Sequence, residues 1–210
     1  MIEIPSSSFI EKFKSTQGAF SVCESIALFN IVKEAPSGEY LELGSHKGKS
    51  GMSAALGLKE GTFHLVEPIF EDTELTSQVV KTVKEFADKN LAIVTYPYYS
   101  TDIIPLFNNL SFVFIDSGIH DDLVMVEVKM LEDRVIQGGI IAVHDYKNQF
   151  TAVERAYNYL LSTGKYEKIE IDWPAIFSYV RENNLEEGNV SWHERGSEEF
   201  PKFVGALKKI

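Results

Sequence analysis

Residues 40–50 read Tyr-Leu-Glu-Leu-Gly-Ser-His-Lys-Gly-Lys-Ser, and this stretch decides the expected fold. A short apolar strand carrying Glu42 runs into a turn bracketed by Gly44 and Gly48, and a helix rich in small residues follows. Glycine has no Cβ and reaches positive φ angles at low cost, so backbone N–H groups and a helix N-terminus can approach a ligand closely here. The stretch therefore indicates a ligand bound at the end of a first strand.

Further polar groups follow apolar segments later in the chain. Glu67, Asp116 and the pair His144-Asp145 each stand directly behind such a segment, where a strand would end. Open α/β sheets bind their ligands at the carboxyl ends of their strands. These side chains are therefore expected to lie in a row along one edge of a sheet.

Helical and strand patterns alternate through most of the sequence, which favours an α/β protein. The expected parallel strands are residues 39–43, 62–66, 91–95, 111–115 and 140–143. Residues 166–171 and 175–181, separated by Asp-Trp-Pro, have strand character and predict a terminal hairpin. The predicted fold is a Rossmann-like, doubly wound, mostly parallel seven-stranded sheet with a C-terminal antiparallel hairpin.

Two helices carry clear local signals. Ser21 with Glu24 three residues later forms a capping box, which predicts that a helix begins there. Apolar residues at 124, 128, 131 and 135 predict another helix that stops at Gly138-Gly139.

Length and composition predict one domain of 210 residues, with a helical segment at 1–35, a core at 36–181 and an extension at 182–210. A net charge of −11 argues against nucleic acid or an anionic membrane as partner. One cysteine, Cys23, excludes an internal disulfide framework. With no secretory signal and no apolar run near ~18 residues, we expect a cytoplasmic protein.

Two phosphate-binding patterns come close to the turn. The dinucleotide fingerprint G-x-G-x-x-G matches the spacing of Gly48 and Gly51, but His46 occupies the middle position. A P-loop needs G-x-x-x-x-G-K-[ST], and residues 44–50 are one residue short of it. Glu42 would also repel a triphosphate. A P-loop-like NTPase, whose nucleotide binding would depend on the lysine and serine of the turn, stays open as an alternative.

An acidic strand and a glycine turn suit a cationic ligand with an amino-acid tail. The Glu-x-Gly-x-x-x-Gly pattern that begins at Glu42 resembles the first motif of class I S-adenosylmethionine-dependent methyltransferases. Together with Gln-Gly-Ala-Phe-Ser at 17–21 and the ordered strand ends, the chain resembles small bacterial O-methyltransferases of the sugar, macrolide and catechol types. The resemblance spans residues 17–181. It implies methyl transfer from S-adenosylmethionine to a hydroxyl of a small molecule or sugar.

The resemblance also implies a set of cofactor-binding residues. Glu67 takes the place that holds the ribose hydroxyls, and a carboxylate can accept a hydrogen bond from both. The segment Tyr-Ser-Thr-Asp-Ile-Ile-Pro-Leu is similar to the adenine-side segment of the catechol type, which places Ser100 and Thr101 by the adenine. The full implied set is Glu42, Gly44, Ser45, Gly48, Ser50, Glu67, Ser100, Thr101 and Asp116.

The two strand ends at Asp116 and at His144-Asp145 match those from which these relatives bind magnesium. The implied metal ligands are Asp116, His144 and Asp145. Two carboxylates suit a hard divalent cation, which can hold substrate oxygens and lower the pKa of a hydroxyl. Relatives carry an acid at the position of His144, and imidazole suits transition metals better than magnesium. Magnesium, a transition metal and no metal at all stay open.

The expected catalytic residues are His120 and Asp116. The histidine of the sugar-type Asp-Gly-Asp-His motif stands one place late here, and His120 is the candidate general base because of its ordinary pKa and its place near the implied metal. This shift, with His144, leaves a non-catalytic cofactor-binding protein of the same fold open. The aromatic residues Trp173, Trp192 and Phe200 would cover the site or form an interface, such as that of a homodimer.

Overall fold

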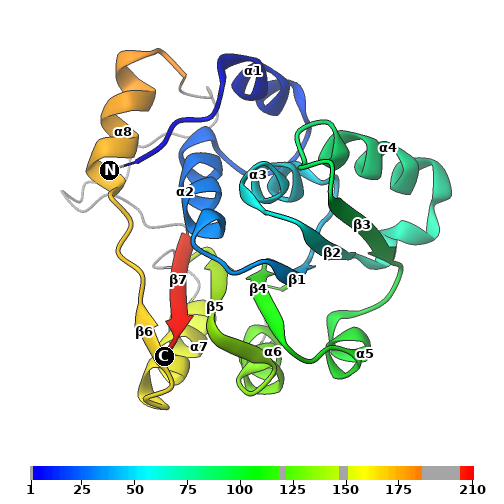
Figure 1. Ribbon diagram of the computed structural model, residues 1–210, viewed down its shortest axis with the longest axis vertical. Helices are drawn as coiled ribbons and strands as arrows, with labels where there is room; N and C mark the ends of the chain where they lie inside the picture. The colour runs from blue at the N-terminus through cyan, green and yellow to red at the C-terminus, as the bar shows by residue number, and fades with distance from the viewer. Residues whose placement is uncertain (1, 119–121, 147–150, 186–203) are drawn as a thin grey trace.

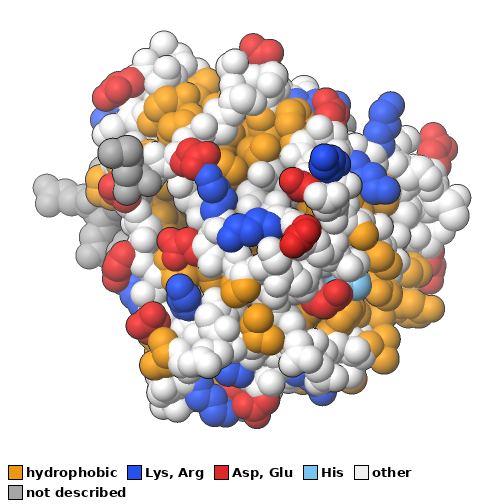
Figure 2. Space-filling view, in the orientation of Figure 1, with side chains coloured by type: hydrophobic (Ala, Val, Ile, Leu, Met, Phe, Trp, Pro, Cys, Tyr) orange, Lys and Arg blue, Asp and Glu red, His pale blue; other side chains and the backbone are white. Residues whose placement is uncertain are grey.

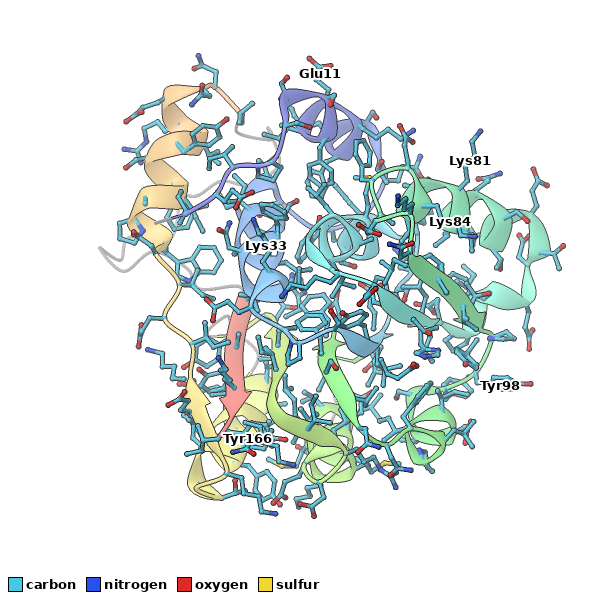
Figure 3. The ribbon with its side chains drawn as sticks, viewed as in Figure 1. Glu11, Lys33, Lys81, Lys84, Tyr98 and Tyr166 are labelled. Atoms are coloured by element: carbon cyan, nitrogen blue, oxygen red, sulfur yellow. The ribbon has the colours of Figure 1, made fainter. Side chains whose placement is uncertain are left out.

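The computed structural model describes residues 2–118, 122–146, 151–185 and 204–210. One twisted sheet lies in the middle of the molecule, and helices cover both of its faces (Figure 1). Tyr98 lies beside the β3 edge of this sheet and Tyr166 at the β6 edge, on opposite sides of the molecule (Figure 3). Among the described residues, no helix is both long and apolar enough to cross a membrane.

The sheet has seven strands in the order β3-β2-β1-β4-β5-β7-β6. The strands are β1 Gly38–Leu43, β2 Gly61–Val66, β3 Leu91–Tyr96, β4 Leu110–Ile115, β5 Val135–His144, β6 Tyr166–Lys168 and β7 Val204–Lys209. The first five are parallel, and β7 is antiparallel to both of its neighbours. The strand order reverses between β1 and β4, so that a crevice for ligands is expected at the carboxyl ends of these two strands. The expected Rossmann-like, mostly parallel seven-stranded sheet is confirmed.

The helices are α1 Ser7–Ser15, α2 Val22–Lys33, α3 Lys49–Gly57, α4 Thr73–Lys84, α5 Ser100–Ile103, α6 Leu123–Leu131, α7 Thr151–Ser162 and α8 Trp173–Glu182, with 3-10 turns η1 Pro68–Glu71 and η2 Ile104–Leu106. α1 to α4 and α8 pack on one face of the sheet, and α5 to α7 on the other (Figure 1). On the surface seen in Figure 2, Lys and Arg side chains are interspersed with Asp and Glu.

Side chains along β1 alternate between the two cores, as the period of a strand requires. Tyr40 belongs to the core under α2 and α3, and Leu41 and Leu43 belong to the core under α6 and α7. Glu42 therefore points to the same side as Tyr40, toward α3. This register places a carboxyl group inside the protein, directly below the glycine turn.

The predicted terminal hairpin is wrong in its second strand. Residues 175–181 lie in helix α8, which the side chain of Asp172 caps by accepting a hydrogen bond from the Ala175 N–H at 3.1 Å. Pro174 stands in its first turn, a position that tolerates proline. The antiparallel partner of β6 is β7, which lies at the end of the described chain and enters the sheet between β5 and β6.

The predicted boundary between α6 and β5 is also wrong. α6 ends at Leu131, and Val135 begins β5, which continues through Gly138 and Gly139 instead of stopping a helix there. Gly138 has φ +78°, and the pairing of β5 with β4 shifts register at Leu110. The predicted capping box of α2 is confirmed by hydrogen bonds in both directions between Ser21 and Glu24.

Candidate functional site

A cavity of about 260 Å³ lies at the carboxyl ends of β1, β4 and β5. It is lined by Gln17, Gly18, Ala19 and Phe20 from the segment before α2, by Gly44, Ser45, His46, Lys47, Lys49 and Ser50 from the glycine turn, and by Glu67, Asp116, Ser117, His144 and Asp145 from the other strand ends. The sheet thus brings together the polar strand ends that the sequence analysis expected in one row.

The glycine turn is shaped by two residues in the left-handed region. Gly44 has φ +89°, and a Cβ there would lie 2.3 Å from the carbonyl oxygen of Asp116, so only glycine fits between β1 and β4. Gly48 has φ +79° and precedes α3 without capping it through a side chain. The first residues of α3, Lys49 and Ser50, line the cavity, so the positive end of the helix dipole lies beside a ligand bound there. The His46 N–H donates to Oε2 of Glu67 at 3.0 Å and ties the turn to the end of β2.

Below this turn lie buried polar atoms that lack a hydrogen-bond partner among the described residues. These are both carboxyl oxygens of Glu42 and the hydroxyl oxygen of Ser45. Burial raises the pKa of Glu42 to about 7, although the hydroxyls of Ser50 and Ser45 nearby act to lower it. The charges of Asp116 and Glu67 raise it further. Glu42 does not line the cavity, and its carboxyl group lies beneath the turn that does.

At the ends of β4 and β5 the polar groups are instead bonded to one another. Nδ1 of His144 lies 2.9 Å from Oδ1 of Asp116 and 3.4 Å from Oδ2 of Asp145. Its Nε2 lies 2.8 Å from Oε1 of Glu24, which comes from the first turn of α2. The ring of Phe20 packs against the imidazole with 5.3 Å between centroids. Both nitrogens of this buried histidine therefore face carboxylates.

The electrostatics of the cluster follow from this arrangement. Burial by itself would lower the pKa of His144, but the charge of Asp116 and hydrogen bonds to Asp116, Asp145 and Glu24 outweigh it and hold that pKa well above its ordinary value. The three carboxyl groups around the ring therefore favour its protonated form. Asp145 has φ +56°, a conformation that aspartate tolerates, and its Oδ2 lies on the side of the ring that carries Nδ1.

Asp116, His144 and Asp145 each offer one ligand atom, and these atoms all lie within 4.8 Å of one another. The cluster offers two carboxylate oxygens and one imidazole nitrogen, and Glu24 lies 2.8 Å from the other nitrogen. A histidine that binds a metal in a protein commonly donates its other N–H to a carboxylate in this way. The donor set is thus chemically suited to a divalent metal.

The remaining residues of the expected site lie away from the cavity lining. Gly48 backs the turn against Val79 and Val83, and Ser100 and Thr101 lie in α5. Ser100 is buried, and it and Ser117 are the hydroxyls next to the buried carboxyl group of Glu127 in α6. His120, the expected general base, lies outside the described residues.

Sequence reasoning missed two contributions to the site. The sequence pattern predicts Glu24 only as a helix cap and gives no signal for Ser117. The spacing of Ser21 and Glu24 contains a signal for the cap but none for a contact with His144, because 120 positions separate the two residues. The side chain of Ser117 donates a hydrogen bond to Glu127, a pairing that only the packing of α6 creates.

Comparison with known proteins gives one family match. A family profile described as a methyltransferase domain matches residues 41–146, which is half of the chain. The matched segment begins in β1 and ends two residues after His144, so it contains the glycine turn and every strand end of the cavity. No curated protein matches the sequence.

Several solved structures share the fold at low sequence identity. An O-methyltransferase from Bacillus cereus in complex with SAH has a TM-score of 0.64 at 14% identity, with 98% of this chain and 93% of that chain covered. The O-methyltransferase TomG from Streptomyces achromogenes, in complex with SAM, has a TM-score of 0.61 at 13% identity, with 99% and 92% covered. The SAH-bound methyltransferase PaMTH1 from Podospora anserina has a TM-score of 0.59 at 12% identity, with 100% and 90% covered.

Proposed function

The chain belongs to the family of methyltransferase domains, and from this premise we propose that it transfers the methyl group of S-adenosylmethionine to a hydroxyl of a small molecule or sugar. The observation that carries the proposal is the glycine turn over Glu42 and Ser45, whose buried polar atoms lack a partner beside a cavity. Buried polar groups are nearly always satisfied, so atoms left open beside a cavity point to a ligand. Structures with the same fold were solved with SAM or SAH.

In this proposal the turn holds the cofactor by its backbone and by charge. Gly44, Ser45 and Ser50 line the cavity, and Gly48 supplies the left-handed bend that brings the turn over it. Glu67 uses one carboxyl oxygen for the His46 N–H, so the other oxygen is available to the ribose hydroxyls. Glu42 lies below the turn, and its ionised form favours the cationic sulfonium over a phosphate.

Ser100 and Thr101 are proposed to lie by the adenine. They do not line the cavity itself, so the adenine ring would extend beyond it, toward the N-terminus of α5. The first position of α5 is Ser100, whose buried side chain lies near Glu127.

We further propose that Asp116, Asp145 and His144 hold a divalent metal ion. Such an ion, when bound, keeps substrate oxygens in place and lowers the pKa of a hydroxyl. Asp116 is central to this arrangement, because its backbone contacts Gly44 while its side chain contacts His144. It therefore lies where the cofactor and the acceptor would meet.

The reaction itself is a direct displacement. The acceptor oxygen forms a bond to the methyl carbon, the bond from that carbon to sulfur breaks, and its electron pair converts the sulfonium to a neutral thioether. The hydroxyl proton passes to a base, for which Asp116 is the candidate among the described residues. Burial raises the pKa of Asp116 against the opposing charge of His144, so in the metal-free site its carboxylate is a stronger base than that of an exposed aspartate. Phe20 and the segment before it cover the cavity on the α2 side and would exclude water.

Titration calorimetry with S-adenosylmethionine and S-adenosylhomocysteine tests the cofactor, with ATP as the competitor. We expect both sulfur ligands to bind at micromolar concentrations and ATP to leave their binding unchanged. Binding of ATP alone would overturn the proposal in favour of a nucleotide-binding protein. Binding of the sulfur ligands, with equal transfer rates for the unchanged chain and the Asp116→Ala variant across an acceptor screen, would point to a non-catalytic cofactor-binding protein.

A further inference from the structure

We propose that Glu24 is a positioning residue for the metal site: it fixes the ring of His144 with Nδ1 toward Asp116 and Asp145, and so makes the site selective for a transition-metal ion over Mg²⁺. This inference rests on the metal site of the proposed function and adds to it a residue from a different element. It assigns a second role to a side chain that also caps α2.

The first step is the double use of the Glu24 carboxylate. Its Oε2 accepts a hydrogen bond from the Ser21 N–H at 2.6 Å, and its Oε1 lies 2.8 Å from Nε2 of His144. The side chain is only 6% exposed, so no water competes freely for either oxygen. Rotation of the carboxylate would break one of the two bonds, and the helix cap therefore holds the oxygen that faces His144 in place.

The second step concerns the ring of His144. A carboxylate only accepts hydrogen bonds, so the nitrogen that faces Glu24 carries a hydrogen. In the neutral ring the lone pair then belongs to Nδ1, which lies 2.9 Å from Asp116 and 3.4 Å from Asp145. Phe20 and Phe114 pack against the ring with centroid distances of 5.3 Å and 6.3 Å. Glu24 thus holds the ring flip and favours the neutral tautomer whose Nδ1 lone pair faces the two aspartates.

The third step is the choice of metal. Mg²⁺ prefers oxygen ligands and retains its waters, whereas imidazole nitrogen favours later divalent ions such as Co²⁺, Ni²⁺ and Zn²⁺. A site with one oriented nitrogen and two carboxylate oxygens therefore favours a transition metal. Carboxylates that orient a ligating histidine typically contribute ~10–100-fold to metal affinity.

The test is a titration of the full chain with Co²⁺, followed by the visible absorption of the bound ion and by calorimetry, with Mg²⁺ in parallel. The variants are Glu24→Ala, Glu24→Gln and Ser21→Ala. Ser21→Ala is the matched control, because it removes the hydroxyl that caps the Glu24 N–H and leaves the contact with His144 in place. Glu24→Gln keeps the volume of the side chain and an oxygen that can accept from Nε2.

We expect Co²⁺ to bind at least ~10-fold more tightly than Mg²⁺ and Glu24→Ala to weaken Co²⁺ binding ~10–100-fold. Glu24→Gln should recover part of this loss, and Ser21→Ala should bind Co²⁺ as the unchanged chain does. Equal losses in Glu24→Ala and Ser21→Ala would overturn the inference, because the role of Glu24 would then be that of a cap alone. Mg²⁺ binding as tight as Co²⁺ would also overturn it.

S-adenosylmethionine binding is measured on the same samples and separates the two proposals. Cofactor binding without any Co²⁺ binding would refute the inference and leave methyl transfer standing. Failure of the unchanged chain to bind the cofactor would refute the proposed function itself, whatever the metal does.

Discussion

The two halves of the cavity are built in opposite ways. At the end of β1, Glu42 and Ser45 are buried and have no hydrogen-bond partner among the described residues. At the ends of β4 and β5, every nitrogen of His144 faces a carboxylate, and α2 supplies one of them. The polar atoms of the first half lack hydrogen bonds, so a ligand that supplies them would stabilise this half most. In the second half the polar groups bond to one another. A metal ion that binds Nδ1 of His144 would have to displace the proton on that nitrogen.

The largest expected loss of stability comes from a change at Gly44, where the end of β1 contacts the end of β4. Gly44→Ala would place a Cβ 2.3 Å from the carbonyl oxygen of Asp116 and strain a backbone with φ +89°. We expect the free energy of unfolding to fall by at least about 5 kcal/mol, since the strands must separate. Urea unfolding of the purified variant measures it.

Gly164→Ala is the matched control for this strain. Gly164 also has a positive φ, +69°, but a Cβ there would meet nothing within 4 Å. The left-handed conformation alone costs about 1 kcal/mol. Similar losses in both variants would show that the contact between the two halves contributes nothing.

His144→Ala breaks the satisfied half and should reduce the free energy of unfolding by about 3–4 kcal/mol, because Glu24 and Asp116 are left without their partner. His64→Ala is the control, since that ring is also buried but its partner Glu39 is 44% exposed. We expect a clearly smaller loss there. Equal losses would mean that the cost arises from the missing ring and not from the carboxylates.

The same variant has a signature in pH. The pKa of His144 is raised in the folded protein, so its contribution to stability is complete below its ordinary value of 6.5 and is lost as the pH rises through the folded pKa. His144→Ala should flatten the decline of stability above about pH 6.5. A decline that persists unchanged in the variant would assign it to another group.

Glu42→Gln tests the unsatisfied half. The pKa of Glu42 rises from 4.5 to about 7 on folding, so the unchanged protein loses stability as the pH rises from 4.5 to about 7. At pH 8 we expect the variant to be more stable by about 3 kcal/mol and to bind S-adenosylmethionine more weakly. Urea unfolding at pH 5 and pH 8 measures the first effect. The exposed Glu11 of α1 (Figure 3) provides the control Glu11→Gln, which should show neither change.

The smallest effect is expected for Ser45→Ala. At pH 5, where Glu42 is protonated and the Ser45 hydroxyl makes no hydrogen bond among the described residues, removal should change the free energy of unfolding by less than about 0.5 kcal/mol. If the hydroxyl binds the cofactor, affinity should fall by up to about tenfold. A loss of stability without a loss of affinity would contradict the view that this half is open toward a ligand.

The parts of the fold that the sequence predicted are those governed by local signals. The strands that end at Glu67 and Asp116 are short, apolar and bounded by turn residues, and the structure places them as expected. The glycine turn was evident because positive φ and close backbone approach require glycine. The cap of α2 was evident because both of its partners lie within one helical turn.

The parts that were missed depend on contacts between distant segments. Residues 175–181 are rich in aromatic and β-branched side chains and resemble a strand, yet the cap at Asp172 and the burial of Ile176 and Val180 on one face make them a helix. The sequence of β7, Val-Gly-Ala-Leu-Lys-Lys, has weak strand propensity. It becomes a strand because β5 and β6 pair with it on both sides. The second role of Glu24 likewise exists only after β5 has brought His144 to α2.

The position of β7 has a consequence for how the protein is made. β7 lies between β5 and β6 although the ribosome synthesises it after both, about 60 residues beyond the end of β5. At ~5–20 residues per second, the edge of β5 stays open on the nascent chain for some seconds before its neighbour emerges. An unpaired edge is a template for pairing with other chains. Chaperones that shield nascent strands are therefore expected to matter most during the synthesis of this last segment.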